Sequence, residues 1–455
     1  MRLAVALCLF GCSSSNRSTH PAPSSIVKMT VTQVLTSVET AADDGIEELG
    51  VERLAVVRFT KNTVLRKQPD MDADEVGTIR KDARAAVLRD APEGAGCKTR
   101  WIEIAPRGWA CDVTTEPTTE SPTRPRVFSF TDEDPAPPVT GVYGVVRGKN
   151  TVAYDSASDA ETGKGRALVG NNSVRAAGSV TVNGKRFWRT TGGDLIDASS
   201  IATFSPSKFR GAIIEDGVMP AWIRGHDKPR DPVVTREQPS ARAKATGKFP
   251  LRTIVHILEE RDGFVRVGED AWISRKDVRA ATLVEPPPGT GEDEKWFDID
   301  LDDQVLVAYE GTRPVYATMV STGKYGHATP VLITRIASKL ERTTMSSDKQ
   351  DVYSVADVPW TMFYDGNYAL HTSYWHDGFG SVRSHGCINL SPHDARLLFR
   401  WSSPDVPPGW IAVRGDEDNP GSLVRVRSAK MGVPNFRGYA RKLREREMTD
   451  SVATR

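Results

Sequence analysis

The chain has 455 residues, 39% of them hydrophobic and 26% charged, and its 60 Lys and Arg nearly balance 59 Asp and Glu. This composition supports folded cores and excludes a wholly disordered chain. The net charge of +1 disfavours a general nucleic-acid binder, and no apolar run beyond the first dozen residues is long enough for a polytopic membrane protein. The length suggests about three domains, and the scattered Gly and Pro favour β modules joined by linkers.

Residues 1–12 predict an export signal, because a short basic start precedes an apolar stretch and small residues. The segment LFGC resembles a bacterial lipobox, in which Cys12 becomes lipidated. We therefore expect an exported periplasmic or cell-envelope lipoprotein that touches the membrane only through its lipid anchor. An ordinary secretion signal and a misassigned start codon are the alternatives. Residues 13–50, rich in Ser, Thr and small residues, predict a flexible tether.

Export places the chain in an oxidising space, where disulfides persist. Cys97 and Cys111 flank two Trp-containing strands of one predicted hairpin, which makes a disulfide between them plausible. Such a bridge would stabilise the fold by about 3 kcal/mol in the chain-entropy model. Two free buried thiols are the alternative. Cys387 is then left unpaired, and an odd thiol in an exported protein requires an explanation.

Three segments repeat one pattern: an opening strand, a variable polar loop, an alternating strand and a last hairpin with an aromatic residue. They span residues 51–115, 141–202 and 203–284. The pattern resembles bacterial SH3-like modules, which are small barrels that act either as spacers or as ligand-binding units.

Between and after these segments, composition predicts linkers and a tail. Residues 116–140 and 285–295 should be extended and solvated linkers, because they are rich in Pro and mixed charge. A further domain is predicted over residues 296–415. The basic tail, residues 416–455, should form one solvated helix, with a polyanionic cell-surface partner as the weaker alternative.

The strongest chemical signal is the segment HTSYWHDGFGSVRSHGCINLSPHDA. Cys387 lies shortly before a predicted helix that has Ser391 as N-cap, Pro392 at its first position and Asp394 in its first turn. Free backbone N–H groups near a helix start favour a thiolate and can stabilise an oxyanion. With a nearby His as proton acceptor, this predicts a Cys–His nucleophile for acyl transfer.

This segment resembles the signature of the L,D-transpeptidases (the YkuD domain). The matching residues are His371, Ser384, His385, Gly386, Cys387, Ile388 and Asn389. Upstream, FDIDLDDQVLVAYEGTRPVYATMVSTGKYGHATP is similar to the start of that domain. The resemblance implies a mostly β, multi-domain chain. Its SH3-like small barrels are followed by a YkuD-type β-sandwich catalytic domain with a short helix after the catalytic Cys.

The resemblance also implies the roles of the site residues. Cys387 would be the nucleophile and His371 the general base, with the Gly386 and Cys387 N–H groups lining the oxyanion hole. His385 would orient the site, and the carbonyl of Thr372 would fix the His371 tautomer. Residues expected around the substrate are Ser384, Asn389, Tyr368 and Trp375; Tyr364 is a further candidate.

The implied reaction uses peptidoglycan stem peptides. Cys387 attacks the carbonyl of the diamino acid's L-centre in a tetrapeptide and expels D-Ala. An amine then resolves the thioester to give a 3→3 cross-link or a link to a wall-anchored protein. Neither metal nor organic cofactor is required.

Three alternatives accompany this interpretation. Water as acceptor gives an L,D-carboxypeptidase or amidase of the same fold. A non-catalytic wall-binding lipoprotein would use only the repeated segments. A zinc site could draw on His371, His376, His385, His393 and Cys387, but their spacing fits no common zinc motif, and His376 and His393 are expected at the surface or in a cap.

Overall fold

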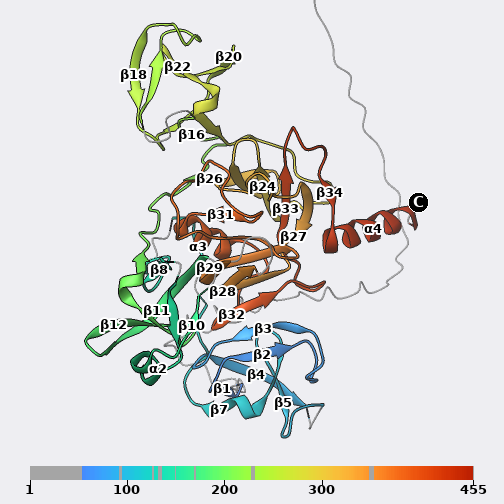
Figure 1. Ribbon diagram of the computed structural model, residues 1–455. Helices are drawn as coiled ribbons and strands as arrows, with labels where there is room; N and C mark the ends of the chain where they lie inside the picture. Colours follow the sequence, from blue (N-terminus) through green and yellow to red (C-terminus); the bar gives the residue numbers. More distant parts are fainter. Residues whose placement is uncertain are drawn as a thin grey trace, which may run out of the picture. The chain divides into compact units, whose positions relative to one another are not determined.

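The computed structural model describes residues 54–91, 95–125, 128–131, 136–148, 150–168, 171–226, 231–347 and 353–453. These residues belong to one compact unit that is mostly β, as the sequence predicts (Figure 1). The predicted signal, the tether and Cys12 lie outside the described residues. Among the described helices, none is long and apolar enough to cross a membrane.

The first module is a small β unit closed around an apolar core. Its strands are β1 (Val56–Phe59), β2 (Thr63–Arg66), β3 (Glu75–Ile79), β4 (Arg84–Ala91), β5 (Trp101–Ile104), β6 (Trp109–Cys111) and β7 (Thr115–Thr118). Alternation along these strands turns Phe59, Leu65 and Ile102 inward. Trp410 and Val413, which belong to a much later strand, complete the same core.

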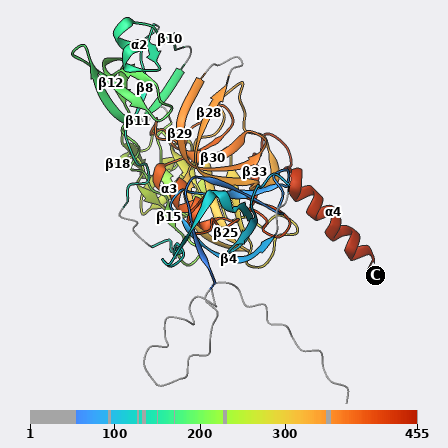
Figure 2. The ribbon, with the colours of Figure 1, turned by 90° about the horizontal axis from the view of Figure 1, so that it is seen from below.

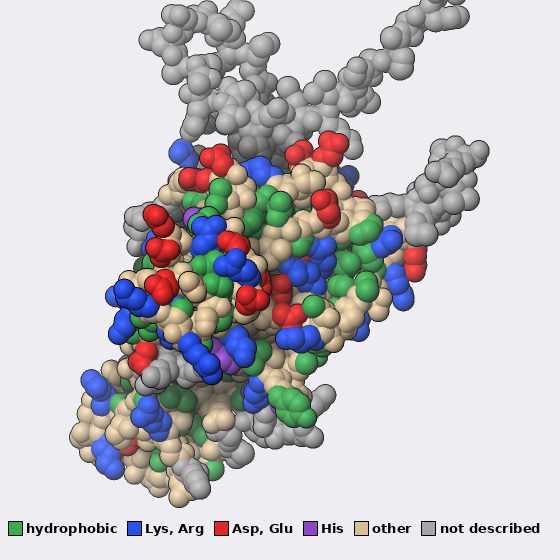
Figure 3. All heavy atoms as spheres, turned by 90° about the horizontal axis from the view of Figure 1, so that it is seen from above, with side chains coloured by type: hydrophobic (Ala, Val, Ile, Leu, Met, Phe, Trp, Pro, Cys, Tyr) green, Lys and Arg blue, Asp and Glu red, His purple; other side chains and the backbone are tan. Residues whose placement is uncertain are grey.

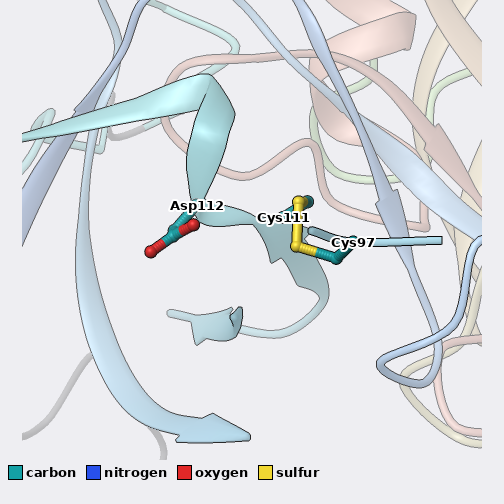
Figure 4. Close-up of side chains that lie close together, drawn as sticks. All are labelled: Cys97, Cys111 and Asp112. Carbon is teal, nitrogen blue, oxygen red and sulfur yellow. A yellow bond between two sulfur atoms is a disulfide. The ribbon is translucent and has the colours of Figure 1, made fainter. Parts of the chain in front are cut away.

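A disulfide joins Cys97 to Cys111, with an S–S distance of 2.01 Å (Figure 4). Cys111 ends β6 directly opposite Trp101 of β5. Asp112 lies beside the bridge (Figure 4) and bonds to Arg100 at 3.0 Å. Among the described residues, these three side chains are the only group of three or more His, Cys, Asp or Glu residues close enough together to hold a metal ion. Because the two sulfurs are bonded to each other, the cluster is no thiolate metal site.

The second module contains one long strand that leaves it for another sheet. Its elements are β8 (Tyr143–Val146), β9 (Val152–Tyr154), α2 (Ala157–Thr162), β10 (Arg166–Ala167), β11 (Asn171–Val182), β12 (Lys185–Thr190), β13 (Leu195–Asp197) and β14 (Ile201–Thr203). The start of β11, Asn171–Ser173, pairs in parallel with Tyr353–Val355 of β29 (Tyr353–Asp365), and Figure 2 shows the two strands side by side.

The third module begins later than the sequence predicts. β15 (Ala212–Ile213) pairs with β26 (Arg313–Met319) and so extends the sheet of the last domain. The module itself comprises β16 (Ala221–Ile223), β17 (Val233–Arg236), β18 (Ala245–Phe249), β19 (Ile254–Val255), β20 (Glu259–Arg261), β21 (Phe264–Gly268), β22 (Ala271–Ser274) and β23 (Val278–Ala280).

The last domain contains two groups of paired strands around one core. The first sheet has the order β15, β26, β25 (Val305–Glu310), β24 (Lys295–Asp300), β33 (Leu423–Arg427), β27 (Leu332–Arg335) and β34 (Asn435–Phe436). The second group contains β28 (Ser338–Ser347), β29, β30 (Tyr368–Thr372), β31 (Ile388–Leu390) and β32 (Trp410–Arg414). Helix α3 (Pro392–Trp401) contributes Leu398 and Trp401 to the shared core.

The central strands of the first sheet are apolar on both faces. Along β24, Phe297 and Ile299 enter the core shared with α3, whereas Trp296 faces a second core that includes Phe209 and Trp222. A strand buried on both faces needs a continuous apolar run, which is what β24 and β25 carry. Residues 209–222 therefore cover the outer face of this sheet.

Two predicted boundaries are wrong. The domain does not end at residue 415, because β33 lies between β24 and β27 and pairs with both. Buried Asp298 of β24 accepts hydrogen bonds from Arg425 at 2.6 Å and Arg427 at 2.8 Å, so the basic residues of this segment are structural. Only the last part of the predicted tail forms a helix, α4 (Gly438–Ala453).

The segment 116–140 is also no free linker. β7 extends to Thr118 through pairing with β1. Farther along, Phe128 and Phe130 pack against the core of the last domain, and the Phe130 ring stacks on Tyr316 with ring centroids 5.7 Å apart. The aromatic residues in this Pro-rich stretch thus anchor it to the last domain.

Ending the chain after residue 415 should prevent folding of the last domain, because it removes the strand that fills the centre of the first sheet. Ending it after Arg437 removes only α4 and should leave a folded protein that is a few kcal/mol less stable, since little apolar area is uncovered. Thermal unfolding followed by circular dichroism compares the two. A cooperative transition in the shorter chain would contradict the role assigned to β33.

Candidate active site

Two parallel strands bring the predicted base and nucleophile together. In the pairing of β30 with β31, His371 lies opposite Asn389 and Leu370 opposite Ile388. Cys387 directly precedes β31, and alternation places it on the same face as Asn389. His371 and Cys387 are therefore diagonal neighbours on one face. The Cys387 Sγ lies 3.6 Å from the Asn367 carbonyl, just before β30 begins.

The ring of His371 is held in one tautomer. Its Nδ1 lies 2.9 Å from the carbonyl oxygen of Thr372, so Nδ1 carries the proton and donates it there. This leaves Nε2 of His371 free to accept a proton. The Thr372 carbonyl thus makes the contact that the sequence predicts for it. Burial lowers the pKa of His371 to about 4, although the Thr372 hydrogen bond opposes the shift. The imidazole is consequently neutral at neutral pH.

The thiol of Cys387 is half-buried and free of any disulfide. Burial raises its pKa, and a backbone hydrogen bond from Ala369 only partly opposes this. The expected helix-start thiolate is therefore wrong: β31 separates Cys387 from α3, whose first residue is Pro392. The thiol of Cys387 and the imidazole of His371 therefore both favour their neutral forms.

The residues before Cys387 form a tight hydrogen-bonded turn. Ser384 Oγ accepts the N–H of Gly386 at 3.0 Å and donates to the Cys387 carbonyl at 2.5 Å. Thr329 Oγ1 donates to the Gly386 carbonyl at 2.8 Å. Gly386 has φ of 117°, and a Cβ there would lie 2.5 Å from the Tyr368 ring, so only glycine fits. Its N–H, expected in the oxyanion hole, is already engaged by Ser384.

The remaining predicted residues lie at different depths. Asn389 is buried, whereas Tyr368 and Trp375 are half-buried, with the Trp375 ring 5.8 Å from that of His371. His385 is exposed. Buried Tyr364, also considered for the cleft, stacks on Tyr368 at 6.4 Å.

The surroundings of His385 include two rings that the motif did not identify. His327 lies 4.5 Å from the His385 ring and Tyr353 lies 5.3 Å from it. Both come from distant strands or loops, so no local sequence signal indicated them. The pKa of Tyr353 is raised, chiefly by burial and then by the charge of Cys387.

His376 was expected at the surface, and this is wrong. Its Nδ1 accepts the Gly378 N–H at 3.2 Å, and its Nε2 lies 3.0 Å from the side-chain amide of Asn389. Burial, followed by the charges of Arg383 and His371, lowers its pKa to about 4. The Asn389 atom nearest His376 Nε2 is Nδ2, whereas the buried Oδ1 of Asn389 has no hydrogen-bond partner among the described residues.

The cap of α3 forms as predicted and has a second task. Ser391 Oγ accepts the Asp394 N–H at 3.2 Å, and Pro392 occupies the first turn. The buried Asp394 carboxylate also accepts hydrogen bonds from Tyr316 at 2.7 Å and Thr318 at 2.6 Å. This ties the helix after the nucleophile to β26 of the other sheet. His393, also expected in a cap, lies 3.4 Å from the Asp394 carboxylate.

The histidines of the zinc alternative do not converge with Cys387 in the described chain, where the Cys97, Cys111 and Asp112 group is the only three-residue candidate. His371 and His376 have their ring contacts within the β30–β31 region.

Alkylation of Cys387 by iodoacetamide should stay slow at neutral pH and rise as the pH passes above about 9, because the reactive thiolate is disfavoured by burial. The variant His371→Gln should hardly move this midpoint, since it removes a neutral base and no positive charge. Mass spectrometry of the labelled peptide gives the rates, with Cys387→Ser as the control for other cysteines. A plateau of fast labelling below pH 7 that His371→Gln removes would instead indicate a thiolate–imidazolium pair.

Comparisons with known proteins show which family the last domain resembles. The family model for the L,D-transpeptidase catalytic domain, YkuD, matches residues 294–426. No curated protein matches the chain. Among solved structures, an Enterococcus faecium L,D-transpeptidase variant is 23% identical over 30% of this chain and 50% of its own, with a TM-score of 0.24. An L,D-transpeptidase from Stackebrandtia nassauensis is 27% identical over 32% of this chain and 58% of its own, with a TM-score of 0.22.

A Mycobacterium tuberculosis L,D-transpeptidase is 19% identical over 30% of this chain and 62% of its own, with a TM-score of 0.23. The chain thus spans about half to three-fifths of the length of these structures. The matched residues extend into β33, as expected for a strand that pairs with β24 inside the sheet of this domain. They also include both His371 and Cys387. Residues 294–426 are therefore similar to the L,D-transpeptidase catalytic domain of the YkuD type.

Proposed function

We propose that the protein is a peptidoglycan L,D-transpeptidase that works through a thioester on Cys387. The donor is a tetrapeptide stem, and the leaving group is its terminal D-Ala. The observation that carries the proposal is the neutral thiol–imidazole pair, in which the Thr372 carbonyl leaves His371 Nε2 as the acceptor. A half-buried thiol is reachable by an extended peptide while remaining protected from bulk water.

The first stage forms the thioester. Cys387 Sγ attacks the carbonyl of the diamino acid's L-centre while its proton passes to His371 Nε2, giving a tetrahedral oxyanion and an imidazolium. The hydrogen bond from Nδ1 to Thr372 stabilises the imidazolium. Because burial disfavours that cation, the proton passes readily to the departing amine. The C–N bond then breaks and D-Ala leaves.

The second stage resolves the thioester. An acceptor amine attacks the thioester carbonyl and gives a proton to His371 Nε2, which returns it to the departing Cys387 sulfur. The Cys387 N–H is the primary candidate for oxyanion stabilisation. The Gly386 N–H can contribute only if it leaves Ser384 Oγ.

The acceptor determines the class of product. A second stem gives a 3→3 cross-link, a wall-anchored protein gives a protein–wall link, and water gives an L,D-carboxypeptidase, which is the second candidate activity. A purely wall-binding lipoprotein is disfavoured, because the base, its orienting carbonyl and the reachable thiol are all retained.

The remaining expectations complete the proposal. The three β modules act as SH3-like spacers or wall-binding units, and export with lipidation of Cys12 places the domain in the cell envelope. No nucleic-acid partner is proposed, and on the face shown in Figure 3 acidic and basic side chains are interspersed. No cofactor is required for the proton transfers described.

Purified protein incubated with a tetrapeptide muropeptide should release D-Ala, and Cys387→Ala should abolish this release. His371→Gln should lower the rate by about 10²- to 10⁴-fold, the usual contribution of a general base. Mass spectrometry of products, with and without candidate amines, identifies transfer or hydrolysis. His256→Gln, which changes an exposed histidine of the third module, is the matched control and should retain wild-type turnover.

Undiminished turnover by folded Cys387→Ala would disprove the assignment of the nucleophile. Release of D-Ala that is insensitive to every amine would establish the carboxypeptidase alternative instead.

A further inference from the structure

The loop between the base and the nucleophile is held by the third module. This loop, residues 376–383, begins five residues after His371 and ends four before Cys387. We call it the catalytic loop. It has no strand or helix of its own, so its backbone position depends on the contacts that other segments make with it.

Three arginines of the third module donate hydrogen bonds to it. Arg224 directly follows β16 and donates through Nε to the Phe379 carbonyl at 2.9 Å and through Nη2 to Ser381 Oγ at 2.9 Å. Arg279 of β23 donates through Nε to the Gly380 carbonyl at 2.8 Å. Arg252 donates through Nη2 to the Asp377 carbonyl at 2.7 Å.

Apolar contacts support the same attachment. Trp222 of β16 and Phe379 of the loop are both buried and belong to one hydrophobic cluster. Phe379 also stacks on Phe209, with ring centroids 5.9 Å apart. Trp222 lies opposite Arg279 in the antiparallel pairing of β16 with β23. The same strand pair therefore supplies both the polar and the apolar contacts to the loop.

The loop in turn reaches the reacting residues. The Phe379 ring contacts His376 at 5.1 Å, and His376 bonds to the side chain of Asn389. Asn389 lies opposite His371 in the strand pairing and two residues after Cys387. A continuous series of contacts therefore runs from the arginines to the strand pair that holds the base and the nucleophile.

The chemistry of Arg224 favours positioning over mere adhesion. Its two acceptors, the Phe379 carbonyl and the Ser381 hydroxyl, are neutral. Its pKa is lowered first by burial and then by the charges of Arg279, Arg383 and Arg252, and the carboxylate of Asp377, which pairs with Arg252, only partly opposes this. A contact that served only adhesion would avoid this cost through carboxylates or apolar residues. Guanidinium groups, by contrast, fix two acceptors at once in a rigid geometry.

We propose that Arg224 and Arg279 are positioning residues that hold the catalytic loop, and through His376 and Asn389 the Cys387–His371 pair, in the reactive arrangement. The third module is then a working part of the enzyme as well as a spacer. This inference rests on the proposed transpeptidase function, but its structural half can be tested without substrate.

The test compares the full-length double variant Arg224→Met/Arg279→Met with Arg266→Met. Arg266 is an arginine of the same module that pairs with Glu259 at 3.1 Å on another strand pair. The double variant should lose about 10- to 100-fold in kcat, as expected for a displaced reacting group. Its KM should change less than about threefold, because the substrate contacts remain. The control should match wild type in both.

Histidine NMR supplies the readout that needs no substrate. In wild type the His376 ring should stay neutral down to a pH near 4; in the double variant, loosening of the loop should hydrate the ring and move its titration toward 6.5. The variant Arg224→Lys keeps the positive charge but loses the two-point contact. Its kcat and its His376 titration should lie between those of wild type and the double variant, and it replaces the double variant in the test if that variant does not fold.

An unchanged kcat in a folded variant, or an unchanged His376 titration, overturns the positioning role. If wild type itself releases no D-Ala, the proposed function fails, and the NMR titration alone then decides whether the arginines hold the loop.

Discussion

The site depends on one strand pairing, the parallel register of β30 with β31. Register in a sheet fixes which side chains share a face, and a slip of one residue would turn His371 away from Cys387. The two strands are short, so their register is secured from outside. Ser321 bridges Asn389 through two backbone hydrogen bonds, of 3.0 and 2.8 Å, and buried side chains from α3 fill the core beneath.

Burial then sets the chemistry of the pair. It raises the pKa of the Cys387 thiol and lowers that of the His371 imidazole, so both partners favour their neutral forms. In the proposed mechanism, such a pair forms a thiolate only as the sulfur attacks the substrate carbonyl. The carbonyl of Thr372 then matters in two ways, since it selects the tautomer at rest and stabilises the cation during transfer.

The modules and the catalytic domain are interlocked by backbone pairing as well as by side chains. β3 of the first module pairs with β32, and β11 of the second pairs with β29. Trp410 of β32 completes the first module's core and packs closely over Gly77, where a Cβ would lie 2.3 Å from its ring. Shared strands and cores of this kind resist independent motion, whereas flexible linkers would allow it.

The sequence by itself indicated the candidate site and determined the broad fold. The spacing of His371 and the Ser384–Asn389 motif indicated the site, and alternation predicted the hairpin of β25 and β26, because period-2 patterns depend on local geometry alone. Tertiary structure decided what depends on distant partners. It placed basic β33 in the centre of a sheet, because Asp298 pairs with Arg425 and Arg427. It half-buried His376 against Asn389 and favoured the thiol form of Cys387, because desolvation is imposed by residues that no local pattern reveals.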